Sequence, residues 1–300
     1  MKTQERINKN YLPALSKVFT PVVMDSLISK GTSAYLNEIV NNSGLIGILD
    51  TSMTLKDFFD WLYNFLIKNY RNEYIYKNAI ANKILLGKHS LNTSHMLTEF
   101  RVAKCKADVV ILNGTSTVYE IKSEYDSFNR LENQIDSYLK VFDHINVITS
   151  ELQSTKIQTL LPENIGIMVL TNKNTIKTVR ESEGNKKNIN TEVLFDSLRK
   201  NEYTCIVKEF YGEVPKVPNT QIYKACKKLF CDLTVENAHD LTIKHLRKRG
   251  SGEMLNDFIN RSPSSLIAYV LSISSNKKKA KGLISLFDNK IESILTPTQP

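Results

Sequence analysis

The sequence predicts an α/β fold with a mixed central β-sheet flanked by helices, and with mainly helical regions before and after that core. Two observations predict this fold. Short apolar runs typical of strands alternate with helical patterns between residues 98 and 179, as in a sheet that is covered by helices. Outside this segment, apolar residues recur every three or four positions, which is the spacing of helices.

The N-terminal region, residues 1–69, is predicted to be helical. Thr54 is a suitable N-cap for a helix over residues 55–67, in which apolar side chains form a stripe along one side. A stripe of this kind is typical of core packing, so no chemistry is assigned to this region.

A second helix, residues 72–86, is predicted to precede the sheet, and it carries Glu73 in its first turn. An acidic side chain is favoured there by the helix dipole alone. The alternative, which we favour slightly, is that this helix delivers Glu73 to a functional site.

Three strands are predicted to follow, at residues 98–102, 109–112 and 118–121. The last two are separated by a segment that contains a Gly, which indicates a tight turn. After them, Asp126 is predicted to cap a helix over residues 127–142.

The remaining pattern predicts a strand, a helix that ends before Pro162, and a hairpin, at residues 144–149, 151–161, 166–170 and 175–179. The polar stretch 181–191 is predicted to be a boundary. Beyond it the pattern is largely helical, at residues 192–199, 221–230, 238–246, 254–259 and 266–272. The sequence therefore predicts three regions: an N-terminal helical region (1–69), a core (70–182) and a C-terminal mainly helical accessory region (190–300).

The charge balance favours a polyanionic partner. The formal net charge is +9 over 300 residues, and a basic surface attracts nucleic acid. The alternative is an ordinary basic protein. Two basic clusters in the C-terminal region suit a nucleic-acid backbone, although solvated helix ends are the commoner interpretation. Their members are Lys244, Arg247, Lys248 and Arg249, and Lys277, Lys278, Lys279 and Lys281.

Cysteine usage and hydropathy predict a cytoplasmic protein without a membrane partner. The four cysteines are scattered and form no CxxC pair, so a reducing compartment is the simpler inference. No uncharged apolar run approaches the roughly 18 residues that span a bilayer. Cys226, Cys231, His239 and His245 follow one another, but the seven-residue gap in the middle is short for a zinc finger.

The candidate site is built around two predicted strands. Asp108 borders one strand, and Glu120 and Lys122 lie two residues apart in the other. Side chains alternate along a strand, so Glu120 and Lys122 are predicted to point the same way. If the strands pair antiparallel, Asp108 and Glu120 converge at one end of the hairpin. Gathered carboxylates and an ammonium group favour a site for a cation and a phosphate.

The helix after these strands is predicted to reach the same site. Arg130, Gln134 and Tyr138 are each four residues apart, so they form a row beside the apolar side of that helix. Packing alone is the alternative for Tyr138. Arg130 and Gln134 are polar, and this favours contact with substrate.

This region resembles the active site of the PD-(D/E)XK nuclease superfamily. The signature residues are Asp108 and then Glu120-Ile121-Lys122, and Gln134-Ile135-Asp136-Ser137-Tyr138 resembles the QhxxY motif of its RecB-type members. The run YEIKSEYDSFNRLENQ also resembles an uncharacterised bacterial and phage family of this superfamily. Lys106-Ala107 precede Asp108 where Pro is the namesake residue. The resemblance covers roughly residues 71–150 and is weaker on either side.

The resemblance implies a restriction-endonuclease-like core and a divalent metal, Mg²⁺ or Mn²⁺. Asp108 and Glu120 match the metal-binding acids, and the carbonyl oxygen of Ile121 matches the remaining protein ligand. Lys122 matches the lysine that orients or activates the attacking water. Oxygen ligands of this kind suit a hard cation that polarises a phosphoryl group.

The resemblance also implies roles for residues on the helices. Glu73 matches, less closely, a helix carboxylate that helps to hold the metal. Gln134 and Tyr138 match the pair that lies near the site and the substrate.

The predicted function is therefore a metal-dependent nuclease, a hydrolase that cleaves phosphodiester bonds in DNA. The sequence leaves RNA open as a substrate, and it leaves both endonuclease and exonuclease action open. The alternative is a catalytically silent nuclease fold that binds nucleic acid or a partner protein, for example in a phage or defence context.

Overall fold

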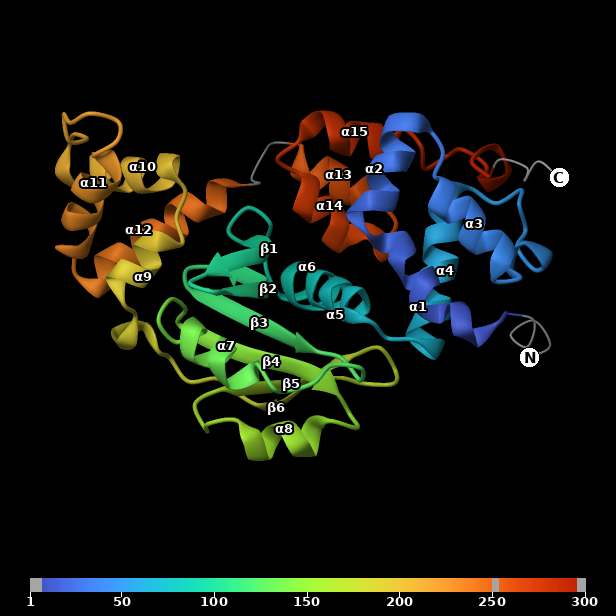
Figure 1. Cartoon of the computed structure of the whole chain (residues 1–300), viewed down its shortest axis with the longest axis horizontal. Helices are drawn as coiled ribbons and strands as arrows, with labels where there is room; N and C mark the ends of the chain where they lie inside the picture. Colours follow the sequence, from blue (N-terminus) through green and yellow to red (C-terminus); the bar gives the residue numbers. More distant parts are fainter. Residues whose placement is uncertain (1–6, 250–253, 296–300) are drawn as a thin grey trace. The chain divides into compact units, whose positions relative to one another are not determined.

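Six strands form one mixed sheet in the computed structural model of the chain, which describes residues 7–249 and 254–295 (Figure 1). Their order in the sheet follows the sequence: β1 (His95–Val102), β2 (Cys105–Leu112), β3 (Ser116–Lys122), β4 (His144–Ser150), β5 (Gly166–Leu170) and β6 (Ile176–Arg180). Strands β1 to β3 form an antiparallel meander, β3 to β5 are parallel, and β6 is antiparallel to β5. The predicted mixed α/β sheet is confirmed.

The connections explain this topology. A tight turn joins β2 to β3, with Gly114 in the left-handed region (φ +69°) that favours glycine. Parallel neighbours need a crossover, which is usually a helix. Helix α7 (Leu131–Tyr138) supplies it between β3 and β4, and α8 (Ser154–Leu160) between β4 and β5.

One predicted helix start is wrong. Asp126 does not cap the helix after β3, because its Oδ2 accepts hydrogen bonds from the Ser123 N–H at 2.8 Å and the Ser123 hydroxyl at 2.6 Å. Asp126 closes a turn instead, which is a common competing role for this residue type. Helix α7 begins only at Leu131.

The chain divides into two compact units. One contains the described residues of 1–82 and 252–300, and the other those of 83–251. The helices of the first are α1 (Leu12–Ser16), α2 (Pro21–Lys30), α3 (Ala34–Asn42), α4 (Leu55–Asn69), α5 (Glu73–Ile80), α13 (Leu255–Arg261), α14 (Ile267–Ile273) and α15 (Lys277–Ile284). Besides the sheet, α7 and α8, the second contains α6 (Leu86–Lys88), α9 (Thr191–Asp196), α10 (Lys200–Tyr211), α11 (Ile222–Cys231) and α12 (Val235–Leu246).

Within the first unit, helices from both ends of the sequence pack together. Thr54 caps α4 as predicted, since its hydroxyl accepts the Asp57 N–H at 3.1 Å. The buried Asn78 side chain donates to the carbonyl oxygen of Ser264 at 2.8 Å and accepts the Ala268 N–H at 2.9 Å. Contacts of this kind join residues 7–82 to residues 254–295, whereas the sequence had placed these segments in separate regions.

Within the second unit, α7 and α9 to α12 share one hydrophobic core with the sheet. Val118 of β3, Tyr138 of α7, Phe195 of α9 and Phe230 of α11 all belong to it. The helices beyond the predicted boundary therefore pack on the sheet, except for those that return to the first unit. In the described parts of the chain, no helix is long and apolar enough to cross a membrane.

Gly166 begins β5 in a position that has no room for a side chain. A Cβ atom there would lie 2.0 Å from Asn146 Oδ1 of β4 and 2.9 Å from the Ser182 backbone nitrogen. Because Asn146 is buried in a strand paired with β5, neither neighbour moves away without disturbing the sheet.

Replacing Gly166 with alanine is expected to lower the free energy of unfolding by about 1–3 kcal/mol, the usual cost of overpacking. Urea unfolding monitored by circular dichroism measures this. Gly184→Ala is the matched control, since its nearest contact would be an ordinary 3.6 Å from Asp143 Oδ1. Equal stability of the two variants would contradict the packing argument.

Asp143, just before β4, joins three parts of the second unit. Its carboxylate accepts the Thr115 hydroxyl at 2.6 Å, the Asn185 N–H at 2.9 Å and the Lys186 N–H at 2.8 Å. Burial by itself would raise the pKa of Asp143, but these hydrogen bonds outweigh it and hold the pKa below the ordinary value of 3.8.

The lowered pKa of Asp143 means that its carboxylate stabilises the fold above the unfolded pKa, and that this stabilisation is lost as pH falls through the folded pKa. We expect Asp143→Asn to cost about 1–3 kcal/mol at pH 7 and progressively less below pH 3.8. Urea unfolding of both proteins from pH 7 to pH 2.5 measures the difference. A cost independent of pH would contradict the assigned role of the charge.

Candidate functional site

Glu120 and Lys122 form a buried ion pair near the end of β3. Their side chains point the same way, as predicted, and Lys122 Nζ donates to Glu120 Oε1 at 2.9 Å. Glu120 is 1% exposed and Lys122 8%. Two charges so deeply buried are stable only if each finds further hydrogen-bonding partners.

Helix α7 supplies those partners from the row predicted by the sequence. Gln134 Oε1 accepts from Lys122 Nζ at 2.9 Å, and Gln134 Nε2 donates to Glu120 Oε1 at 2.5 Å. One turn later, the Tyr138 hydroxyl donates to Glu120 Oε2 at 2.7 Å. Gln134 and Tyr138 therefore reach the predicted site, and they fix both oxygens of Glu120.

The Tyr138 hydroxyl is held in its protonated, donating form. Burial, the charge of Glu120 and the hydrogen bond to it raise the pKa of Tyr138 far above its usual range, and the charge of Asp108 adds to this. Both predicted acids are thus close enough to act on one hydroxyl group.

Asp108 lies where β2 and β3 separate. The pairing of these strands ends at Val109 and Tyr119, and beyond it the Ile121 N–H donates to Asp108 Oδ2 at 2.8 Å. The carboxylate of Asp108 thus accepts a backbone N–H of β3 beyond the last residues that pair with β2. The role of the Ile121 carbonyl oxygen stays a prediction.

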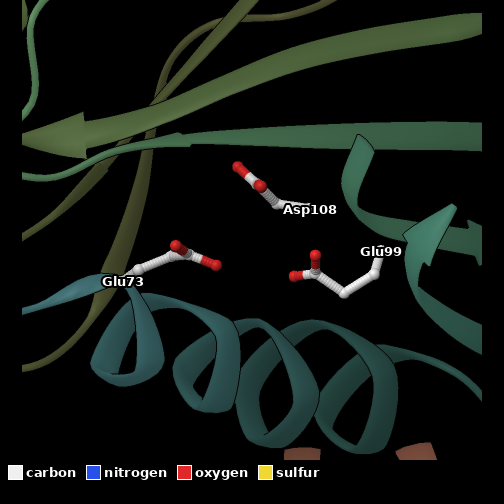
Figure 2. Close-up of side chains that lie close together, drawn as sticks. All are labelled: Glu73, Glu99 and Asp108. Atoms are coloured by element: carbon white, nitrogen blue, oxygen red, sulfur yellow. The ribbon is translucent and has the colours of Figure 1, made fainter. Parts of the chain in front are cut away.

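Glu99 of β1 is a further carboxylate beside Asp108. Carboxylate oxygens of the two residues lie within 4.8 Å of each other, and Figure 2 shows the two side chains together. Glu99 has a left-handed backbone (φ +57°), which is uncommon for a residue other than glycine. Lys106, across the strand pair, forms an ion pair with Glu99.

The sequence placed Glu99 in a strand but gave no signal that it belongs to the site. Thr98 pairs with Val109 and Phe100 with Ala107, so Glu99 is opposite Asp108. Only the strand register reveals this proximity.

Glu73 and Arg130 are less closely tied to this network. Glu73, also drawn in Figure 2, belongs to the other unit; it lies in the first turn of α5 and pairs with Lys77 at 2.9 Å. Arg130 is an exposed residue at the start of α7. Their predicted roles in catalysis and substrate binding stay predictions.

The other sequence candidates have structural partners. Of the residues considered for zinc, His239 Nε2 lies 3.0 Å from Ser116 Oγ and His245 Nε2 lies 3.0 Å from Glu209 Oε2. Each histidine therefore has a hydrogen-bonding partner within the fold, and His239 Nδ1 also lies 3.1 Å from Asp240 Oδ1.

The first basic cluster is likewise partly structural. Arg249 is paired with Glu202 at 2.5 Å and lies over the Phe100 ring at 5.1 Å, and Lys244 is paired with Glu209 at 2.6 Å. In the second cluster, Lys279 forms an ion pair with Asp25 at 2.5 Å.

Two carboxylates at the site offer the oxygen ligands that hard divalent cations prefer. They belong to Asp108 and Glu99, whose carboxylate oxygens lie within 4.8 Å of each other, whereas both oxygens of Glu120 accept hydrogen bonds within the protein. Lys122 adds positive charge next to Glu120. The site therefore combines carboxylates with an ammonium group, and the binding of a cation and a phosphate there stays a prediction.

Comparison with known proteins points to a phage family. The family model described as bacteriophage P4 protein cII matches residues 67–269, more than half of the chain. Protein cII of Enterobacteria phage P4 is 21% identical over 183 residues, which are 59% of this chain and 67% of that protein. These matches confirm the phage association that the sequence predicted; the nuclease resemblance remains a prediction.

Among solved structures, a protein of unknown function from Silicibacter pomeroyi is similar, with 21% identity and a TM-score of 0.26. The match covers 31% of this chain and 62% of that one.

Removing the Tyr138 hydroxyl is expected to destabilise the protein. Tyr138→Phe deletes a hydrogen bond to a buried charge, so we expect the free energy of unfolding to fall by about 1.5–3 kcal/mol. Urea unfolding measures it. Tyr119→Phe, the same change at a buried tyrosine of β3, should cost less, since no hydrogen bond of comparable strength joins its hydroxyl to a described residue. If both substitutions cost the same, the Glu120 bond does not stabilise the fold.

Proposed function

The chain belongs to the bacteriophage P4 protein cII family, and we propose that it is a metal-dependent nuclease that hydrolyses phosphodiester bonds in DNA. One observation carries the proposal. Glu120 and Lys122 are buried together at a strand end, fixed by Gln134 and Tyr138, beside the carboxylate of Asp108. A fold stabilised by packing alone gains little from such a pair, because burying charges is costly.

In the proposed site, Asp108, Glu120 and the Ile121 carbonyl oxygen would hold Mg²⁺ or Mn²⁺. When bound, the ion supplies Lewis-acid stabilisation of the negative charge that develops on the phosphoryl oxygens. Glu99 supports the proposal, because a second carboxylate beside Asp108 strengthens the attraction for a cation. Glu73 is proposed to help hold the ion.

Lys122 is proposed to orient the attacking water and to offset charge on the phosphate. An ammonium group has three protons to donate. Two of them are directed to Glu120 Oε1 and Gln134 Oε1, which leaves one for a water molecule or a phosphate oxygen. Gln134 thus acts as a positioning residue for Lys122, and Tyr138 does the same for Glu120. Arg130, exposed at the start of α7, is proposed to contact the substrate backbone.

A second candidate function is a catalytically silent module that binds nucleic acid or protein. One observation favours it: both oxygens of Glu120 already accept hydrogen bonds from Lys122, Gln134 and Tyr138. A carboxylate used in this way stabilises the fold without a metal.

The two functions are separated by a cleavage assay on linear, circular and single-stranded DNA with Mg²⁺ or Mn²⁺. We expect cleavage by the wild type, and none above background for Asp108→Ala and Glu120→Ala. Lys122→Ala is expected to lower the rate by about 10²–10⁴, the usual contribution of a positioned proton-transfer group. Glu73→Gln should lower it by about 10–100-fold, typical of residues that support a metal site.

Metal binding, followed by calorimetry with Mn²⁺, distinguishes the roles further. Lys122→Ala should retain the metal, whereas Asp108→Ala should lose it. Asp136→Ala is the matched control, because this carboxylate is exposed on α7, and its loss should leave cleavage unchanged. Cleavage that survives both Asp108→Ala and Glu120→Ala would refute the site, and wild-type protein that binds DNA without cutting it would favour the silent module.

A further inference from the structure

A groove between α7 and α8 lies apart from the Glu120 network. Its volume is about 630 Å³. Phe128, Leu131 and Ile135 contribute apolar side chains from the α7 side, and Leu160 and Leu161 from the α8 side. Leu160 is 53% exposed, so an apolar side chain that lines the groove is still in contact with solvent.

The rim of the groove is mainly acidic. Asp126, Glu132 and Asp136 line it together with one base, Lys156, whose ammonium group lies 5.2 Å from the centre of the Phe128 ring. The Asp126 carboxylate is engaged by Ser123. Glu132 and Asp136, in contrast, are exposed and form no ion pair with any residue of the described chain.

These two acids repel each other, although Glu132 itself lies in the first turn of α7, where the helix dipole favours negative charge. Glu132 and Asp136 are four residues apart on α7, and like charges at this spacing repel each other. Asp136 also lies in the last turn, where the helix dipole disfavours negative charge. A cationic ligand would relieve both effects.

The groove is opposite in sign to the protein as a whole. Three acidic residues and one basic residue line the groove, although the chain carries a net charge of +9. A surface of this sign repels the phosphates of nucleic acid. A ligand that matches this groove would have both apolar and basic groups.

We propose that this groove binds a partner protein through an amphipathic helix whose apolar side is flanked by Lys or Arg. Two neighbouring helices with an apolar floor form the type of groove into which such a helix packs. Its cations would pair with Glu132 and Asp136. The proposal does not depend on nuclease activity.

The test uses a fluorescent synthetic peptide of about 18 residues, long enough for five helical turns, with Leu on one side and Lys on the other. Binding is followed by fluorescence anisotropy without DNA or metal. We expect the wild type to bind this peptide. A second peptide, in which Glu replaces Lys, should bind at least about tenfold more weakly, because its charges repel the acids of the groove.

Substitutions in the groove locate the binding. Glu132→Lys/Asp136→Lys should weaken binding at least about tenfold. The matched control, Glu213→Lys/Glu236→Lys, makes the same change in net charge at exposed positions next to α10 and in α12, outside the groove lining, and should have less than about a twofold effect. Circular dichroism confirms that each variant is folded.

Leu160→Asp separates groove binding from general electrostatic attraction. It removes an apolar contact and adds a negative charge, so the proposal expects weaker binding of the Lys peptide, whereas simple charge attraction expects stronger binding. Stronger binding by Leu160→Asp, equal effects of the two double variants, or no binding to the wild type would each overturn the proposal. Occupancy by a small molecule instead would appear as an absence of peptide binding.

Discussion

The buried ion pair between Glu120 and Lys122 constrains the structure around it. Removing one partner of a buried pair typically costs about 3–5 kcal/mol, because the other charge is left without compensation. The pair is stable here only because α7 places Gln134 and Tyr138 against it. The hydrogen bonds from α7 to the Glu120 carboxylate therefore help to fix the position of this helix on the sheet. Helix α7 is also the crossover from β3 to β4.

Much of the sheet was predictable because local sequence determined it. The strands near residues 109–112 and 118–121 are apolar runs separated by a glycine turn, and they are present as β2 and β3. Two helices, α10 and α15, were not predicted, although both have one apolar side; in α15 four of the eight residues are lysines, which were interpreted only as a basic cluster. Asp126 shows another limit of local rules, since a turn and a helix cap use the same side-chain oxygen.

Pairings between distant segments were not predictable from pattern alone. Asn78 bonds to Ser264 and Ala268 across almost 190 positions, and nothing near either residue indicates the other. Glu99 was not assigned to the site for a different reason, because only the register of β1 against β2 places it opposite Asp108. Glu120, Lys122, Gln134 and Tyr138, in contrast, were identified together, because two-residue spacing on a strand and four-residue spacing on a helix fix side-chain direction locally.

Net charge proved a coarse guide, because individual basic residues have different uses. Arg249 and Lys244 are taken up by Glu202 and Glu209, so they add less to the external field than their number suggests. Lys122 belongs to neither basic cluster, yet it is the buried basic residue that pairs with Glu120 in the candidate site.

The acidic residues in and next to α7 also differ in whether they have partners. Gln134 and Tyr138 of this helix satisfy the buried Glu120, whereas Glu132 and Asp136 of the same helix line the groove beside α8. The charge of Glu120 is compensated by hydrogen bonds, whereas Glu132 and Asp136 are exposed to solvent. Helix α7 therefore has two sides of different chemistry, one that fixes Glu120 and one that presents exposed acids beside an apolar groove.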